Sequence, residues 1–110
     1  MTDVRVLITD DEAPARARLR RMLDELDGYE VIGEAANGRE ALELCAKLGP
    51  DILLLDIRMP EMDGLETARH LATADTAPAV IFTTAFDNYA IDAFDAQAVG
   101  YLLKPVRRER

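Results

Sequence analysis

The chain alternates apolar stretches of strand length with amphipathic stretches of helical period, and this alternation restricts its fold more than any other feature. The strand-like stretches are 4–9, 30–35, 52–55, 79–84 and 99–103, and the helix-like stretches are 11–27, 39–48, 65–74 and 88–98. Strict strand–helix alternation predicts a doubly wound α/β domain, in which helices cover both faces of a parallel sheet. The uninterrupted apolar run 52–55 is typical of a central strand that is covered on both sides.

Length and composition narrow the class of protein. The 110 residues suffice for one domain, 1–110. No apolar run approaches the roughly 20 residues of a membrane span, and the first residues lack the regions of a secretory signal. Cys45 is the only cysteine, so neither an internal disulfide nor a cysteine metal site is available. We therefore expect a cytoplasmic protein that does not associate with membranes.

The charge balance argues against direct binding of nucleic acid. Acidic residues number 21 against 13 basic ones, which gives a net charge of -8. Such a chain repels phosphate backbones and anionic lipid on average. An early group of arginines falls at helical spacing, and we expect it to form a solvated helix face: Arg16, Arg18, Arg20 and Arg21.

Polar residues gather where the predicted strands end. In doubly wound sheets, ligands bind outside the carboxyl ends of the strands, so these positions are informative. The residues are Asp10, Asp11 and Glu12 after the first strand, Asp56 after the third, Thr84 at the end of the fourth and Lys104 after the fifth. We expect them to converge on one edge of the sheet.

Such a group of residues predicts phosphoryl-transfer chemistry. Three carboxylates in one place repel each other unless cations compensate them. Lys104 compensates one charge, and a divalent cation that prefers hard oxygen ligands, Mg²⁺ or Mn²⁺, would compensate the rest. A carboxylate beside such a cation, a lysine and a hydroxyl is what phosphoryl transfer to an aspartate requires. Taken alone, Asp10 and Asp11 could instead cap the following helix, where negative charge is favourable.

The chain resembles the receiver domains of bacterial two-component response regulators. The resemblance rests on 6–12, 53–64, 83–85 and 100–105, which stand in this order at predicted strand ends. It implies a CheY-like, flavodoxin-like sheet of five strands in the order 2-1-3-4-5. It also implies that Asp56 accepts a phosphoryl group from a sensor histidine kinase. Asp11 and Asp56 would bind Mg²⁺ directly, Asp10 directly or through water, and Arg58 through its backbone carbonyl.

The resemblance further implies a conformational switch. Lys104 would pair with one phosphoryl oxygen, and Thr84 would donate a hydrogen bond to another. Tyr101 would respond by turning from an exposed to a buried position. This movement would change the face formed by the fourth helix and the fifth strand, and so control dimerisation or output. Arg58 and Phe86 flank the site and either tune the access of water to the phosphoryl group or are ordinary surface residues.

The stretch 82–94 is similar to the subgroup of alginate-type regulators that carry a LytTR-type DNA-binding domain. We therefore expect a transcription regulator whose output domain lies outside this chain. The family has a fifth helix after the fifth strand, and we expect that helix to be missing or cut off here. The uncovered strand would then favour self-association.

Two alternatives belong to other functional classes. An aspartate-dependent phosphatase also uses a strand-end aspartate with Mg²⁺, and Glu12 follows Asp10 at the spacing of its second acid. We expect no such turnover. The other alternative is a pseudo-receiver, which is never phosphorylated and acts as a constitutive dimerisation module. The full set of Asp11, Asp56, Thr84 and Lys104 argues against it.

Overall fold

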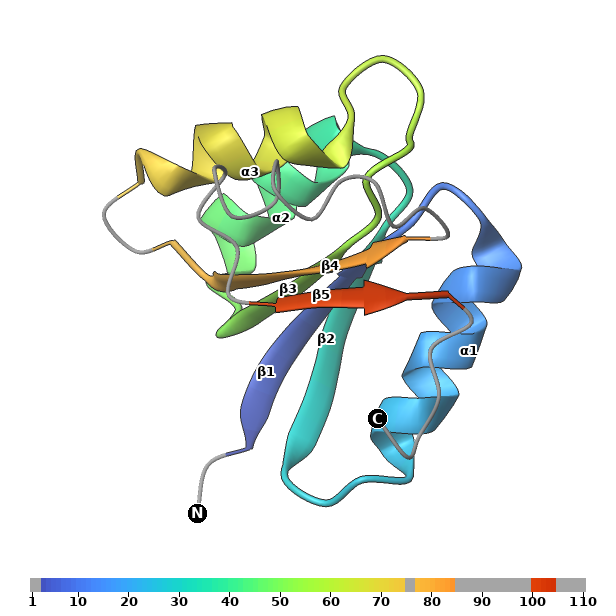
Figure 1. The fold of residues 1–110 in the computed structure, drawn as a ribbon. Helices are drawn as coiled ribbons and strands as arrows, with labels where there is room; N and C mark the ends of the chain where they lie inside the picture. Colours follow the sequence, from blue (N-terminus) through green and yellow to red (C-terminus); the bar gives the residue numbers. More distant parts are fainter. Residues whose placement is uncertain (1–2, 75–76, 85–99, 105–110) are drawn as a thin grey trace.

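Five parallel strands form one sheet in the order β2-β1-β3-β4-β5, with α1 on one face and α2 and α3 on the other (Figure 1). The computed structural model describes residues 3–74, 77–84 and 100–104. The strands are β1 (Val4–Thr9), β2 (Tyr29–Ala35), β3 (Ile52–Leu55), β4 (Ala79–Thr84) and β5 (Gly100–Leu103). The helices are α1 (Ala13–Asp24), α2 (Gly38–Leu48) and α3 (Gly64–Ala72).

This architecture confirms the predicted α/β class and strand order. The predicted helix 88–98 and the segment 105–110 lie outside the described residues. The expectation that a fifth helix is missing therefore stays a prediction. α1 starts at Ala13, two residues later than predicted, because Asp11 and Glu12 belong to the loop that leaves β1.

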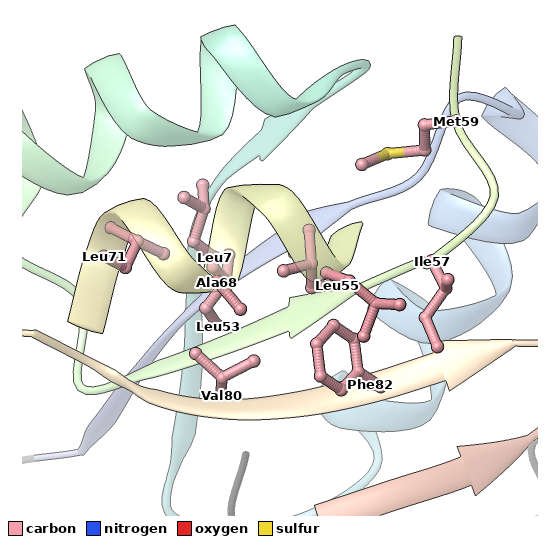
Figure 2. Close-up of a cluster of buried hydrophobic side chains, with 10 residues drawn as sticks. Leu7, Leu53, Leu55, Ile57, Met59, Ala68, Leu71, Val80 and Phe82 are labelled. Atoms are coloured by element: carbon pink, nitrogen blue, oxygen red, sulfur yellow. The ribbon is translucent and has the colours of Figure 1, made fainter. Parts of the chain in front are cut away.

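The sheet separates two apolar clusters. The cluster on the α2 and α3 side includes Leu7, Leu53, Leu55, Ala68, Leu71, Val80 and Phe82 (Figure 2). The cluster on the α1 side consists of Val6, Ile8, Leu19 and Leu54. Successive residues of β3 thus pack on opposite faces, as expected for a central strand that is buried on both sides. Packing on both faces fixes the strands, and through them the residues at their carboxyl ends.

The edge strand β2 contains a β-bulge. Val6 of β1 pairs with Val31, and the next residue, Leu7, pairs with Gly33. Ile32 is therefore an extra residue in β2. Because side chains alternate between the faces of a sheet, one extra residue moves every later side chain of the strand to the opposite face.

The loop after β3 folds back onto the end of that strand. The backbone N–H of Gly64 donates to the carbonyl of Ile57 at 2.7 Å. A Cβ at position 64 would overlap the carbonyl oxygen of Asp56 and would lie 2.9 Å from the Cα of Ile57. Only glycine allows this close approach, which holds the backbone beside Asp56 in place.

Gly64→Ala should therefore lower the stability of the domain by about 2 kcal/mol, since the new methyl group meets backbone atoms that cannot turn away. We expect the melting temperature to fall by several degrees. Gly33→Ala is the matched control, because its Cβ would meet only the methyl ends of Leu7 and Leu48, at 3.3 and 3.4 Å. Equal melting temperatures for Gly64→Ala and the wild type would contradict the steric argument.

Candidate functional site

The carboxyl ends of the strands bring the predicted residues to one edge of the sheet. The parallel ladder continues into the residues that follow the strands. The N–H of Asp10 donates to Ala35, that of Asp56 to Thr9 and that of Lys104 to Thr84, at 3.1, 3.0 and 2.7 Å. The backbones of the three site residues are thus held by the sheet itself, which gives their side chains a fixed base.

Three carboxylates meet at this edge. Asp10, Asp11 and Asp56 each offer an oxygen atom, and these atoms lie within 4.8 Å of one another. Asp10 and Asp56 are buried, whereas Asp11 is exposed. Two buried acids and one exposed acid thus form a cluster that solvent reaches at Asp11.

Lys104 neutralises part of this charge. Its Nζ lies 2.6 Å from Oδ2 of Asp10 and 3.5 Å from Oδ2 of Asp56. The other oxygen of Asp10, Oδ1, accepts the backbone N–H of Glu12 at 2.9 Å. Asp10 thus holds the loop before α1 and also pairs with Lys104. It does not cap α1, because the N-cap residue is Glu12 and this helix start has no side-chain cap, so the capping alternative is wrong.

Burial and charge shift the titration of two groups. Burial raises the pKa of Asp56 to about 6, and the charges of Asp10 and Asp11 act in the same direction, while Lys104 opposes them. For Lys104, burial favours the neutral amine, but the hydrogen bond to Asp10 and the charge of Asp56 outweigh it and raise its pKa. Lys104 is therefore a permanent cation at neutral pH, and Asp56 is mostly ionised there.

The cluster fits a hard divalent cation. Three carboxylates against one ammonium leave an excess of negative charge on oxygen ligands. Mg²⁺ accepts one or two carboxylates and keeps several of its waters, which suits a cluster with one exposed side. The donor atoms therefore match the predicted metal.

The structure places the remaining predicted residues as follows. Thr84 is fully buried at the end of β4, and its carbonyl accepts the N–H of Lys104. Arg58 is exposed, two residues beyond Asp56. Tyr101 pairs with Phe82 in the ladder between β4 and β5, but its side chain lies outside the described residues, as does Phe86. The roles of Arg58 and Tyr101 stay predictions.

The sequence pattern does not predict the partners of two arginines of α1. Arg16 and Arg20 were expected on a solvated face, but both bind Glu34 near the end of β2, with N–O distances of 3.1 and 2.6 Å. The expectation of a solvated side chain is wrong for Arg16, which is 19% exposed, whereas Arg20 pairs with Glu34 and is still 42% exposed. Their spacing of four residues on one helix face was the available signal.

Comparison with known proteins identifies the family. A model of the response regulator receiver domain matches residues 6–110. The chain belongs to the response regulator receiver family. It is therefore a signalling domain and not a turnover enzyme, as expected, which disfavours the phosphatase alternative.

Individual relatives also support the expected similarity to alginate-type regulators. The chain is 57% identical over 105 residues to the positive alginate biosynthesis regulatory protein of Pseudomonas aeruginosa, covering 94% of the chain and 42% of that protein. It is 48% identical over 107 residues to the transcriptional regulatory protein BtsR of Salmonella typhi, with coverages of 97% and 44%. The expected similarity to alginate-type regulators is confirmed. The chain spans less than half the length of these relatives.

Solved structures agree with the fold. The response regulatory domain of protein mrkE from Klebsiella pneumoniae superposes with a TM-score of 0.88 at 29% identity, covering 96% of this chain and 87% of that one. A chain of the CheX–CheY–BeF3–Mg²⁺ complex from Borrelia burgdorferi gives a TM-score of 0.90 at 28% identity, covering 98% of this chain and 83% of that one.

None of the helices in the described ranges combines the length and apolar character needed to cross a bilayer.

Proposed function

We propose that this receiver domain accepts a phosphoryl group on Asp56 from the phosphohistidine of a sensor histidine kinase. The observation that carries the proposal is the position of Lys104, whose Nζ lies between two buried carboxylates that end neighbouring strands. A structural ion pair would need one acid. The cluster has three, and the excess charge suits a site that takes up a cation and a phosphoryl group.

The metal would be Mg²⁺, or Mn²⁺ in its place. Asp11 and Asp56 would bind it directly, with the carbonyl of Arg58. Asp10 would act through water, because both of its oxygens already accept hydrogen bonds from Glu12 and Lys104. When bound, the ion supplies positive charge that offsets the negative oxygens of the transferring group.

The side chains perform the transfer. An oxygen of Asp56 attacks phosphorus, a P–O bond forms, and the P–N bond to the donor histidine breaks, with its electron pair returning to the imidazole. The ammonium of Lys104 lies 3.5 Å from Asp56, close enough to pair with an oxygen of the incoming group. The hydroxyl of Thr84, at the end of β4, would donate to another oxygen.

The phosphoryl group would then shift a conformational equilibrium. Lys104 and Thr84 are linked by a backbone hydrogen bond, so their movements are coupled. A group that favours one of two states shifts the populations by its differential affinity for them. We propose that Tyr101 carries this shift to the face that the predicted helix 88–98 would form with β5, and that phosphorylation controls self-association there.

The complete regulator would extend beyond this domain. We propose that residues 1–110 form the receiver unit of a cytoplasmic transcription regulator with a LytTR-type DNA-binding domain outside this chain. The similarity to the alginate regulator and BtsR supports this organisation. The net charge of -8 makes this segment itself a poor ligand for DNA or an anionic membrane.

A direct test is intact-mass spectrometry after incubation with a small acyl phosphate. We expect a single phosphoryl adduct in the presence of Mg²⁺ and none with a chelator. Fragmentation should place the adduct on Asp56, and hydroxylamine should remove it, as it cleaves acyl phosphates. A folded chain that forms no adduct would favour the pseudo-receiver alternative, a constitutive dimerisation module.

A further inference from the structure

An arginine of α1 is tied to the backbone of the acidic loop. Nη1 of Arg16 donates to the carbonyl of Asp10 at 2.7 Å, and its Nε donates to Oε1 of Glu34 at 3.1 Å. The guanidinium thus joins three elements: α1, the end of β2 and the loop that follows β1. It is only 19% exposed, so it is not a mobile surface side chain.

The bulge in β2 makes this contact possible. After the extra residue Ile32, Glu34 pairs with Ile8 instead of Thr9. Ile8 belongs to the apolar cluster on the α1 side, so Glu34 also faces α1, where Arg16 and Arg20 reach it. Hydrogen bonds from Arg20 and Arg16 outweigh burial and lower the pKa of Glu34, which keeps it charged at neutral pH. Glu34 is therefore a stable anchor for the guanidinium.

The carbonyl that Arg16 holds is part of the peptide bond between Asp10 and Asp11. The direction of this planar group determines how the backbone leaves Asp10 and in which direction Asp11 projects. Asp10 is fixed by Lys104 and by the N–H of Glu12, whereas Asp11 is exposed. The bond from Arg16 is the described contact that orients the peptide before Asp11.

We propose that Arg16, anchored by Glu34, is a positioning residue that orients Asp11 for binding the divalent cation. The inference rests on the proposed function, because it assumes that Asp11 is a metal ligand. Groups that orient ligands from outside the coordination sphere change metal affinity by about 10- to 100-fold when they are removed. Arg16 lies in the first turn of α1, five residues after Asp11, and bonds the carbonyl of the residue that precedes this acid.

The direction in which Mg²⁺ affinity changes when Arg16 is replaced distinguishes a positioning role from a purely electrostatic effect of its charge. Arg16 is a cation near the site, so its removal should strengthen Mg²⁺ binding if only long-range electrostatics acted. Loss of the hydrogen bond to the Asp10 carbonyl should weaken binding instead. Arg20 is the matched comparison. It also pairs with Glu34 from α1, but within the described part of the chain it does not bond the loop that carries Asp10 and Asp11.

The test is calorimetric titration of the unphosphorylated chain with MgCl₂, which needs no phosphoryl transfer. We expect Arg16→Met to weaken Mg²⁺ affinity by about tenfold and Arg20→Met to change it by less than about twofold. Arg16→Lys keeps one donor for the carbonyl and should fall between Arg16→Met and the wild type. Thermal melts with a chelator establish that each variant is folded, and Arg16→Lys carries the test if Arg16→Met is not.

The outcomes distinguish a failure of the positioning role of Arg16 from a failure of the proposed metal site. Equal Mg²⁺ affinities for Arg16→Met and Arg20→Met would overturn the positioning role while leaving the metal site intact. Asp11→Asn is the reference for losing a ligand. If the wild type does not bind Mg²⁺, or if Asp11→Asn binds it equally well, the proposed function fails and the inference fails with it.

Discussion

Asp56→Asn should abolish the phosphoryl adduct and leave the fold intact. The asparagine amide has nearly the shape of the carboxylate but is too weak a nucleophile to attack phosphorus. We expect a complete loss of the adduct in intact-mass spectra recorded with an acyl phosphate and Mg²⁺. Asp27→Asn is the matched control, since Asp27 is exposed in the turn between α1 and β2 and its loss changes the net charge equally. An adduct forming on Asp56→Asn at the wild-type rate would contradict the assignment.

The same substitution should make the metal-free domain more stable at neutral pH. The pKa of Asp56 lies at about 6 in the folded chain against an ordinary value of 3.8. At 1.36 kcal/mol for each unit of pKa, ionised Asp56 destabilises the fold by about 3 kcal/mol. Asparagine carries no charge and avoids this cost. We expect Asp56→Asn to melt on the order of 10 °C above the wild type in the presence of a chelator.

The pH dependence of the stability of the wild type follows from the raised pKa of Asp56. Between pH 3.8 and about 6, the folded chain binds more protons at Asp56 than the unfolded chain does, so the stability of the wild type falls as pH rises. The loss is nearly complete by pH 7, and it disappears as the pH falls below 3.8. The difference in melting temperature between Asp56→Asn and the wild type should therefore widen from pH 5 to pH 7 and stay constant above.

Two controls sharpen this comparison. Asp27→Asn measures what relief of general negative charge contributes in a chain of net charge -8. Added Mg²⁺ should raise the melting temperature of the wild type more than that of Asp56→Asn, because a ligand stabilises the state that binds it. A difference that does not vary between pH 5 and pH 7 would show that Asp56 is not the titrating group.

Local sequence patterns predict the fold here because helix and strand periods agree with turn signals throughout. The turn signal Asn37-Gly38 stands directly before the second helical stretch, and the side chain of Asn37 caps α2 by accepting the N–H of Glu40 at 2.8 Å. The run 52–55 was expected at the centre of the sheet, and β3 lies between β1 and β4. The bulge at Ile32 could not be predicted, since β2 is an edge strand of mixed polarity without a clear alternation of apolar and polar residues. Its register depends on packing against α1.

The site residues at the strand ends could be predicted for a similar reason. Parallel strands place their carboxyl ends at one edge, so the positions of Asp10, Asp56 and Lys104 follow from the topology. The contact from Arg16 to the Asp10 carbonyl could not be predicted in this way. It depends on which face Glu34 occupies, and a single extra residue in β2 reverses that face. The close approach of Gly64 to Asp56 is likewise a property of the folded loop.

The pairing of Lys104 with Asp10 joins residues that are 94 positions apart. During synthesis, Asp10 is among the first site residues to leave the ribosome and Lys104 is the last. Strands β1 to β4 and all three acids are therefore made before the ammonium that offsets part of their charge. In that interval the acidic edge is uncompensated, which opposes early closure of the sheet at its carboxyl end. Docking of β5 then completes the sheet and brings Lys104 to the acids in one event, so the carboxylates gain their ammonium partner only when the last strand of the sheet is in place.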